Sequence, residues 1–232
     1  MPRLRIVTFN IAHARGLSPI QGLTSQRKLR LNLRRIAALL DRLAPDIVAL
    51  QEVDECSRWA GNFDHLDYLR VHAGYPHAVF GINNRRTGLL NLSYGNAVLS
   101  RHPILAAETV VFGQRSMGEK GFLYVELDVA GRCVPVVNLH LHHSSREQRL
   151  RQLHHLLAWL REKHRERGAG WVHAARARFL LGLLQHVVDD RRQIESGQLD
   201  DRLSEPTGEV LRHFVLDVAD AARCTRHLLT VR

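Results

Sequence analysis

The sequence predicts an α+β fold in which two sheets are layered. An apolar strand, an amphipathic helix and a second apolar strand follow one another over residues 4–50, and shorter strand-like runs fill much of residues 75–139. Strands joined through a helix can pair in parallel, whereas strands joined by a tight turn pair antiparallel. With 232 residues, 45% of them hydrophobic, the chain is long enough for one large domain of this kind.

The N-terminal unit has clear boundaries. Leu4–Phe9 is an apolar run with β-branched residues, and the loop after it contains glycine and proline. Ser25 can cap a helix over Gln26–Leu43, in which leucine and isoleucine recur every three or four residues. Asp46–Leu50 is the next strand, so we expect a β-α-β unit with two parallel strands.

The later elements are mostly short strands. We expect helices over residues 65–73 and 145–164, and strands over 75–80, 95–99, 110–112, 121–129 and 132–139, with a loop at 83–88. The tight turn Ala130-Gly131 joins the last two strands. A loop with Gly168 and Gly170 and one more apolar run, residues 179–181, follow.

The charge of the chain favours an anionic partner. Its formal net charge is +10, with 15 histidines besides. Much of this excess lies over residues 27–35 and 146–167, where arginine on the wet face of a helix is an ordinary finding. The charge therefore permits binding of nucleic acid without establishing it.

Composition also indicates the compartment. The three cysteines, Cys56, Cys133 and Cys224, form no CxxC pair, which argues against a disulfide framework and a zinc knuckle. The N-terminus leads directly into a strand, and no run approaches the roughly 18 apolar residues of a membrane span. We expect a cytoplasmic protein without a secretion signal or membrane anchor, and a monomer.

Polar motifs stand where apolar runs end. They are Thr8-Phe9-Asn10, Gln51-Glu52-Val53-Asp54, Tyr94-Gly95-Asn96-Ala97-Val98-Leu99-Ser100-Arg101 and Asn138-Leu139-His140-Leu141. Polar groups at strand ends gather on one rim of a sheet, where α/β enzymes build their sites.

Each motif has a chemical and a structural interpretation. A carboxylate such as Glu52 at a rim is a ligand for a hard divalent ion, but an isolated Gln-Glu pair is more often a surface or capping feature. Asn138 and His140 alternate along one strand and so face the same side, where an imidazole can donate to a phosphate oxygen or protonate a leaving group. A single strand histidine is more often structural, and Asn96 after a glycine is more often a turn residue.

In their order and spacing these motifs resemble the endonuclease/exonuclease/phosphatase superfamily, over residues 3–182. The resemblance implies a four-layer αββα sandwich and hydrolysis of a phosphate ester with Mg²⁺ or Mn²⁺. It makes Glu52 the principal metal ligand, with Asn10 supporting the ion or the phosphate. It implies that His140, Asn10, Asn96 and Asn138 are catalytic. Glu119-Lys120-Gly121 matches a charged segment of the family, although an exposed hairpin entry explains it equally well.

The resemblance stops after residue 182. Where the family continues with Gly-Asp-Phe-Asn, whose aspartate orients the attacking water, this chain reads Gly182-Leu183-Leu184-Gln185. A later Ser-Asp-His sequence is also missing, and we expect Asp189, Asp190, Asp200, Asp201 and Asp217 to be solvated residues that follow no final strand. We therefore divide the chain into residues 1–182, the family-like domain, and residues 183–232, a divergent or out-of-frame tail, so that the sandwich is incomplete at its C-terminal end.

The function expected from these residues is phosphodiester hydrolysis with Mg²⁺ (or Mn²⁺), as in a nuclease or another phosphodiesterase. The substrate is a phosphate ester, DNA and RNA included, and no membrane partner is expected. The alternatives are a catalytically impaired fragment of such a hydrolase and a basic, non-catalytic binding domain. Substrate choice depends on the loops at residues 16–25 and 58–64, in which no diagnostic aromatic or basic motif stands out.

Overall fold

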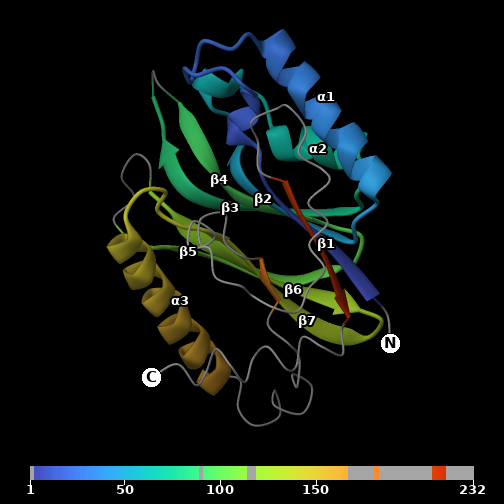
Figure 1. Cartoon of the computed structure of the whole chain (residues 1–232), viewed down its shortest axis with the longest axis vertical. Coiled ribbons are helices and arrows are strands. Elements are labelled where there is room, and N and C mark those ends of the chain that lie inside the picture. Colours follow the sequence, from blue (N-terminus) through green and yellow to red (C-terminus); the bar gives the residue numbers. More distant parts are fainter. Residues whose placement is uncertain (1–2, 89–90, 114–118, 167–179, 183–210, 218–232) are drawn as a thin grey trace.

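The computed structural model describes residues 3–88, 91–113, 119–166, 180–182 and 211–217. Two sheets lie face to face, with helices α1 and α2 outside one sheet and α3 outside the other (Figure 1). The elements are β1 Arg3–Asn10, η1 Ala12–Ala14, α1 Gln26–Leu43, β2 Ile47–Asp54, η2 Arg58–Ala60, α2 His65–His72, β3 His77–Arg86, β4 Leu92–Ser100, β5 Ile104–Val111, β6 Gly121–Val129, β7 Arg132–His140, α3 Arg146–Glu166, β8 Leu180–Gly182 and β9 Leu211–Asp217.

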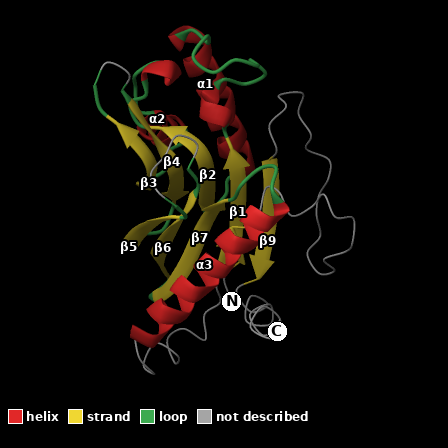
Figure 2. Ribbon diagram, turned by 90° about the vertical axis from the view of Figure 1, so that its left-hand side faces the viewer, coloured by secondary structure: helices red, strands yellow, loops and turns green. Residues whose placement is uncertain are grey.

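Both sheets are mixed. The first has the strand order β3-β4-β2-β1-β9 and the second β5-β6-β7-β8. Strands β1 and β2 are parallel, with Asn10 beside Gln51, which confirms the β-α-β unit expected from the sequence. Strand β8 is parallel to β7, with Gly182 beside Asn138, whereas β9 runs antiparallel to β1 along its edge (Figure 2).

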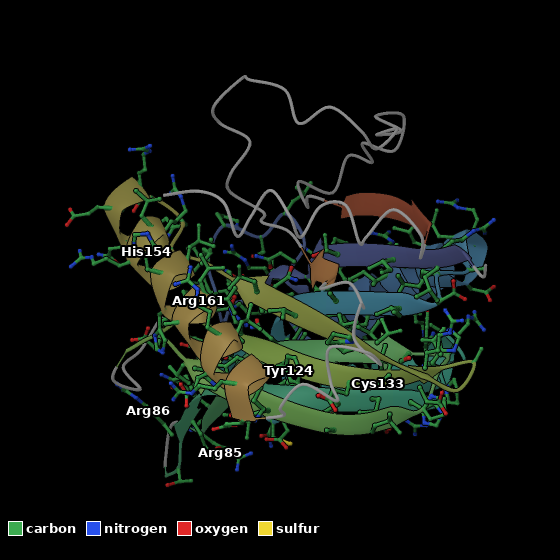
Figure 3. All side chains as sticks on the ribbon, turned by 90° about the horizontal axis from the view of Figure 1, so that it is seen from below. Arg85, Arg86, Tyr124, Cys133, His154 and Arg161 are labelled. Atoms are coloured by element: carbon green, nitrogen blue, oxygen red, sulfur yellow. The ribbon has the colours of Figure 1, made fainter. Side chains whose placement is uncertain are left out.

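Three apolar layers separate the four structural layers. Side chains of α1, α2 and the first sheet form one, including Leu33, Leu40, Leu69, Val7 and Leu50. The second lies between the sheets, with Ile6, Ile47, Val98, Val125 and Val136. The third lies between the second sheet and α3 and contains Phe122, Tyr124, Leu139, Leu156 and Leu160. Tyr124 lies beneath α3, whereas His154 and Arg161 of this helix point outward (Figure 3). The four-layer αββα sandwich is thus confirmed.

Some expected boundaries were wrong. Residues 83–86 belong to β3 rather than to a loop, and β2 continues past Leu50 to Asp54. Asp217 does end a strand, β9, but its antiparallel register places it beside Arg3, at the end of β1 opposite Asn10. The loop with Gly168 and Gly170 and four of the aspartates expected to be solvated, residues 189, 190, 200 and 201, lie outside the described residues. No helix in the described part of the chain is long and apolar enough to cross a membrane.

Candidate active site

At one end of the two sheets, polar side chains of the strands face the gap between the sheets. On β1, Leu4 and Ile6 belong to the layer between the sheets, so Asn10 continues on that face. On β7, Val134 and Val136 do the same, and Asn138 and His140 follow at the same spacing. Apolar residues therefore fill one part of the gap and polar residues its end, as the strand motifs predict.

A β-bulge places Glu52 on this face. Leu50 and Val53 both pack toward the helices, although strict alternation would put residues three apart on opposite faces. The pairing of β2 with β4 shifts register between these two residues, and Glu52 takes a left-handed backbone conformation with φ 53°. Such a conformation costs a non-glycine residue roughly 1–2 kcal/mol. The extra residue turns both Glu52 and Asp54 toward the gap.

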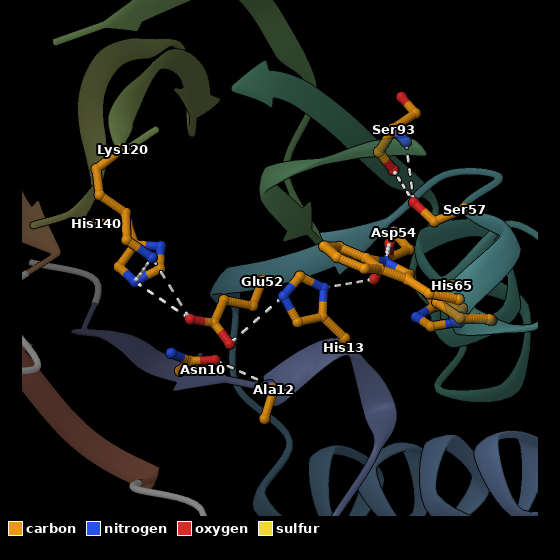
Figure 4. A network of polar contacts seen from close by, with 12 residues as sticks. Asn10, Ala12, His13, Glu52, Asp54, Ser57, His65, Ser93, Lys120 and His140 are labelled. Carbon is orange, nitrogen blue, oxygen red and sulfur yellow. Dashed lines mark hydrogen bonds and ion pairs between the residues drawn. The ribbon is translucent and has the colours of Figure 1, made fainter. Parts of the chain in front are cut away.

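Two nitrogen groups lie on one side of Glu52. Its Oε1 is 3.6 Å from Nε2 of His140 and 3.6 Å from Nζ of Lys120 (Figure 4). The Lys120 ammonium donates to Nε2 of His140 over 3.1 Å, since an ammonium group has no lone pair to accept. Burial lowers the pKa of Lys120, while the neighbouring Glu52 acts in the opposite direction. His140 is 5% exposed, so this pair forms a partly enclosed wall, whose positive charge lies on Lys120.

His13 lies on the other side of Glu52. Its Nε2 is 3.7 Å from Oε2 of Glu52, and its Nδ1 is 2.7 Å from Oδ2 of Asp54. The second oxygen of Asp54 accepts a hydrogen bond of 2.8 Å from the Trp59 indole. Burial alone would raise the pKa of the fully buried Asp54, but the hydrogen bond and the charge of His13 lower it. The rings of His13, Trp59 and Tyr94 contact one another with centroids 5.3–5.5 Å apart.

These groups surround a cavity of about 250 Å³. Its lining is formed by His13, Glu52, Trp59, Asn83, Tyr94, Gly95, Glu119, Lys120 and His140. Lys120 and His140 lie on one side of the Glu52 carboxylate and His13 lies on the other (Figure 4). The aromatic rings of Trp59 and Tyr94 contact His13 on that second side. The structure thus brings Glu52 and His140 together, as predicted.

Glu52 is held as a carboxylate. Burial opposes its charge, but His13, His140 and Lys120, together with a hydrogen bond from the Asn10 side chain, lower its pKa to about 2. Asn10 Oδ1 accepts from the Ala12 amide over 2.9 Å, so the side-chain amide group of Asn10, rather than its oxygen, faces Glu52. Asn10 therefore lies beside Glu52 and can orient its carboxylate, while its expected roles as a metal ligand and in catalysis stay predictions.

Asn96 and Asn138 lie behind the cavity and join the two sheets. Both are fully buried. The Asn138 amide donates to the carbonyl oxygens of Leu50 and Ala97 in the first sheet, over 2.7 and 2.8 Å, and its oxygen accepts from Gln51 over 2.7 Å. Asn96 donates in the other direction, to the carbonyl oxygen of Gly121 over 3.0 Å. The geometry gives these two asparagines a positioning role, and their catalytic role stays a prediction.

The oxygen donors of the cavity fit a divalent ion that keeps most of its waters. Mg²⁺ binds through one or two carboxylates and retains several waters, and Glu52 supplies one such carboxylate, 22% exposed, with Glu119 also at the cavity. Among the described residues, no group of three or more His, Cys, Asp and Glu side chains is arranged to hold a metal ion. A cage built from protein ligands alone is therefore not found in this part of the chain.

Sequence reasoning missed several residues of the cavity. His13 and Asn83 gave no signal, and the loop with Trp59 was judged to lack a diagnostic aromatic residue. The sequence is compatible with Lys120 either at the site or at an exposed hairpin entry, and the structure places it at the site. Gly182, where the motif similarity ends, lies beside Asn138, and Leu183 to Gln185 lie outside the described residues.

Comparisons with known proteins agree with this architecture. The solved endonuclease/exonuclease/phosphatase from Beutenbergia cavernae DSM 12333 is 26% identical with a TM-score of 0.55, over 68% of this chain and 44% of that one. Sphingomyelinase C from Streptomyces griseocarneus is 25% identical with a TM-score of 0.51, over 71% and 60% of the two chains. Truncated TDP2 from Caenorhabditis elegans, 19% identical with a TM-score of 0.52 over 85% and 68%, shares the fold.

This chain spans less than two thirds of the length of the first two of these structures. No curated protein sequence matches it significantly. The family model described as Endonuclease/Exonuclease/phosphatase family matches residues 7–172, which is well over half of the chain. The chain therefore belongs to the endonuclease/exonuclease/phosphatase family.

Proposed function

We propose that this protein is a metal-dependent phosphoesterase that hydrolyses a phosphodiester. The observation that carries the proposal is the placement of Glu52 within 3.6 Å of both His140 and Lys120, at one cavity between the sheets. A carboxylate for a metal ion and two nitrogen groups for phosphate oxygens are groups that stabilise the transition state of phosphoester hydrolysis.

Each residue of the site has a separate role in this proposal. Glu52, oriented by Asn10, would hold Mg²⁺ or Mn²⁺. When bound, such an ion polarises the phosphate and neutralises the charge that develops on its oxygens. Lys120, which donates to His140 in the free site, would instead bind a phosphate oxygen of the substrate. His140, once Nε2 is released and protonated, would donate to the phosphate or give this proton to the leaving oxygen. Asn96 and Asn138 keep the two sheets, and hence Glu52 and His140, in register.

The substrate class follows from the two sides of the cavity. The wall of Lys120 and His140 suits a phosphate group, and the aromatic rings of Trp59 and Tyr94, on the His13 side, suit an apolar or planar neighbouring group. With a net charge of +10, DNA and RNA are candidate substrates, alongside other phosphodiesters. We further propose that the protein acts as a monomer in the cytoplasm.

A catalytically impaired hydrolase is the second candidate. It is favoured by the end of β8, where Gly182 lies beside Asn138 but Leu183 follows instead of the aspartate implied by the family resemblance. A leucine cannot orient the attacking water, so such a chain would bind a phosphate ester and hydrolyse it slowly.

The test is steady-state hydrolysis of bis(p-nitrophenyl) phosphate and of a short DNA duplex with Mg²⁺ or Mn²⁺. We expect metal-dependent turnover that Glu52→Gln abolishes and that His140→Gln lowers about 10²–10⁴-fold. Glu147→Gln and His154→Gln, on the exposed face of α3, are matched controls and should leave turnover unchanged. Substrate binding without turnover would favour the impaired hydrolase, and turnover that survives Glu52→Gln would contradict the proposal.

A further inference from the structure

The backbone that carries His13 is unusual. Ala12, His13 and Ala14 all take left-handed conformations, with φ of 47°, 55° and 58°, although none is glycine. The turn is held at three points: the Ala12 amide donates to Asn10, the Ile11 amide to the carbonyl of Gln51, and Asn32 to the carbonyl of Ala14. Strained backbone that the surroundings enforce is concentrated at functional sites.

Asp54 fixes the ring of His13. The carboxylate accepts from Nδ1 over 2.7 Å, and its other oxygen is taken by the Trp59 indole, which donates over 2.8 Å. A metal ion binds the neutral form of the ring. In that form the proton stays on Nδ1 and the lone pair is on Nε2, the atom directed at Glu52. A carboxylate that orients a histidine in this way is the usual outer partner of a metal-binding imidazole.

His13 and Glu52 are spaced for a shared ion. Their Nε2 and Oε2 atoms are 3.7 Å apart, a separation that two metal–ligand bonds of about 2 Å each can bridge. His140 is placed differently, because its Nε2 lies 3.1 Å from the Lys120 ammonium, which donates to it. Of the two imidazoles at the cavity, His13 is therefore the one that presents a nitrogen donor next to the carboxylate.

We propose that His13 Nε2 is a second protein ligand of the metal ion, beside Glu52, and that Asp54 is its outer-sphere partner. This inference rests on the proposed function, since it concerns the ion of the same site. Mg²⁺ strongly prefers oxygen ligands, whereas imidazole suits transition ions. The nitrogen ligand accordingly shifts the preference of the site from Mg²⁺ toward Mn²⁺.

The test uses the full chain with Mn²⁺ alone and reads the ligand directly. Electron spin echo envelope modulation of bound Mn²⁺ should show coupling to one ¹⁴N nucleus, which His13→Gln removes. His140→Gln and the exposed control His154→Gln should both retain it. Calorimetry should show that His13→Gln weakens Mn²⁺ binding more than Mg²⁺ binding. Asp54→Asn, which leaves the ring in place, should weaken Mn²⁺ binding about 10–100-fold and retain the coupling.

The outcomes separate the two proposals. If Mn²⁺ binds in a Glu52-dependent manner and supports hydrolysis, but shows no ¹⁴N coupling or keeps it in His13→Gln, the inference is overturned and the proposed function stands. An imidazole that only pairs ionically with Glu52 gives this result. If Glu52→Gln leaves Mn²⁺ binding unchanged and no hydrolysis is found, both proposals fail. Circular dichroism of His13→Gln, with Asp54→Asn as the second variant, excludes loss of folding as the cause.

Discussion

Replacing Asn138 with leucine tests the role of the buried polar bonds between the sheets. Asn138 is 0% exposed and makes three hydrogen bonds of 2.7–2.8 Å, two as a donor to Leu50 and Ala97 and one as an acceptor from Gln51. Leucine has nearly the same shape but can make none of them, so two carbonyl oxygens lose this partner without access to water. The Gln51 amide keeps Thr8 Oγ1 and the carbonyl oxygen of Ala49 as acceptors.

The size of the effect follows from these groups. A buried polar group that loses its partner costs about 1–3 kcal/mol. Two carbonyl oxygens are affected and the new apolar side chain offsets part of the sum, so we expect a loss of about 2–4 kcal/mol. That is a large share of the roughly 5–15 kcal/mol by which domains are stable. Urea unfolding followed by circular dichroism measures it. Arg132→Leu, at the exposed start of the same strand, is the matched control.

A loss below about 1 kcal/mol for Asn138→Leu would refute this reasoning. It would mean that the hydrogen bonds of Asn138 contribute little to stability and that the apolar layer holds the two sheets together. The role of Asn138 would then be the catalytic one that the sequence motif suggests.

Three further predictions follow from the site. Because Glu52 has a pKa of about 2 in the folded protein instead of 4.5, the unfolded chain binds more protons between these pH values. As the pH drops through this window, the free energy of unfolding of the metal-free protein should therefore fall by up to about 3 kcal/mol from this group. Urea titrations should show that Glu52→Gln lacks this part of the pH dependence. Lys120→Met removes the ammonium 3.6 Å from Glu52 and should lower kcat/KM about 10²-fold, while exposed Arg161→Met should not. Gly95→Ala would bring a methyl group within 1.9 Å of the Gly81 carbonyl. It should lower the thermal midpoint more than Gly74→Ala, where the added methyl group meets no atom within 4 Å and only the left-handed backbone, with φ 66°, opposes it; equal shifts would contradict the close approach.

The parts of the fold with regular periodicity were predictable. The leucine and isoleucine spacing of α1 and its Ser25 cap gave the bounds of that helix, and the apolar runs gave β1, β6 and β7. The start of β5 and the end of β3 were missed because their residues are half exposed or charged, as at Arg85 and Arg86 (Figure 3), and are held in strands by pairing with distant partners. Such pairing is a tertiary effect that a local pattern does not contain.

For the site, alternation along a strand located His140, and a motif located Glu52. The reason that Glu52 faces the cavity could not be read locally, since it depends on the bulge between Leu50 and Val53. His13 and Trp59 come from irregular segments, and only the left-handed turn and the bond to Asp54 bring them to the cavity. For Asn96 and Asn138 the sequence motif predicted residues of the site, but it could not show that both side chains are fully buried and lie behind the cavity.

Anomalous diffraction from crystals soaked in Mn²⁺ and inorganic phosphate tests the central claim most directly. The account predicts a manganese peak in the cavity between the sheets, about 2.2 Å from a Glu52 oxygen, with phosphate between it and the nitrogens of Lys120 and His140. Soaked Glu52→Gln crystals should lack the peak. A cavity without manganese, or a peak confined to the stacked rings of His142 and His143, would contradict the assignment of this cavity as a metal-dependent phosphoesterase site.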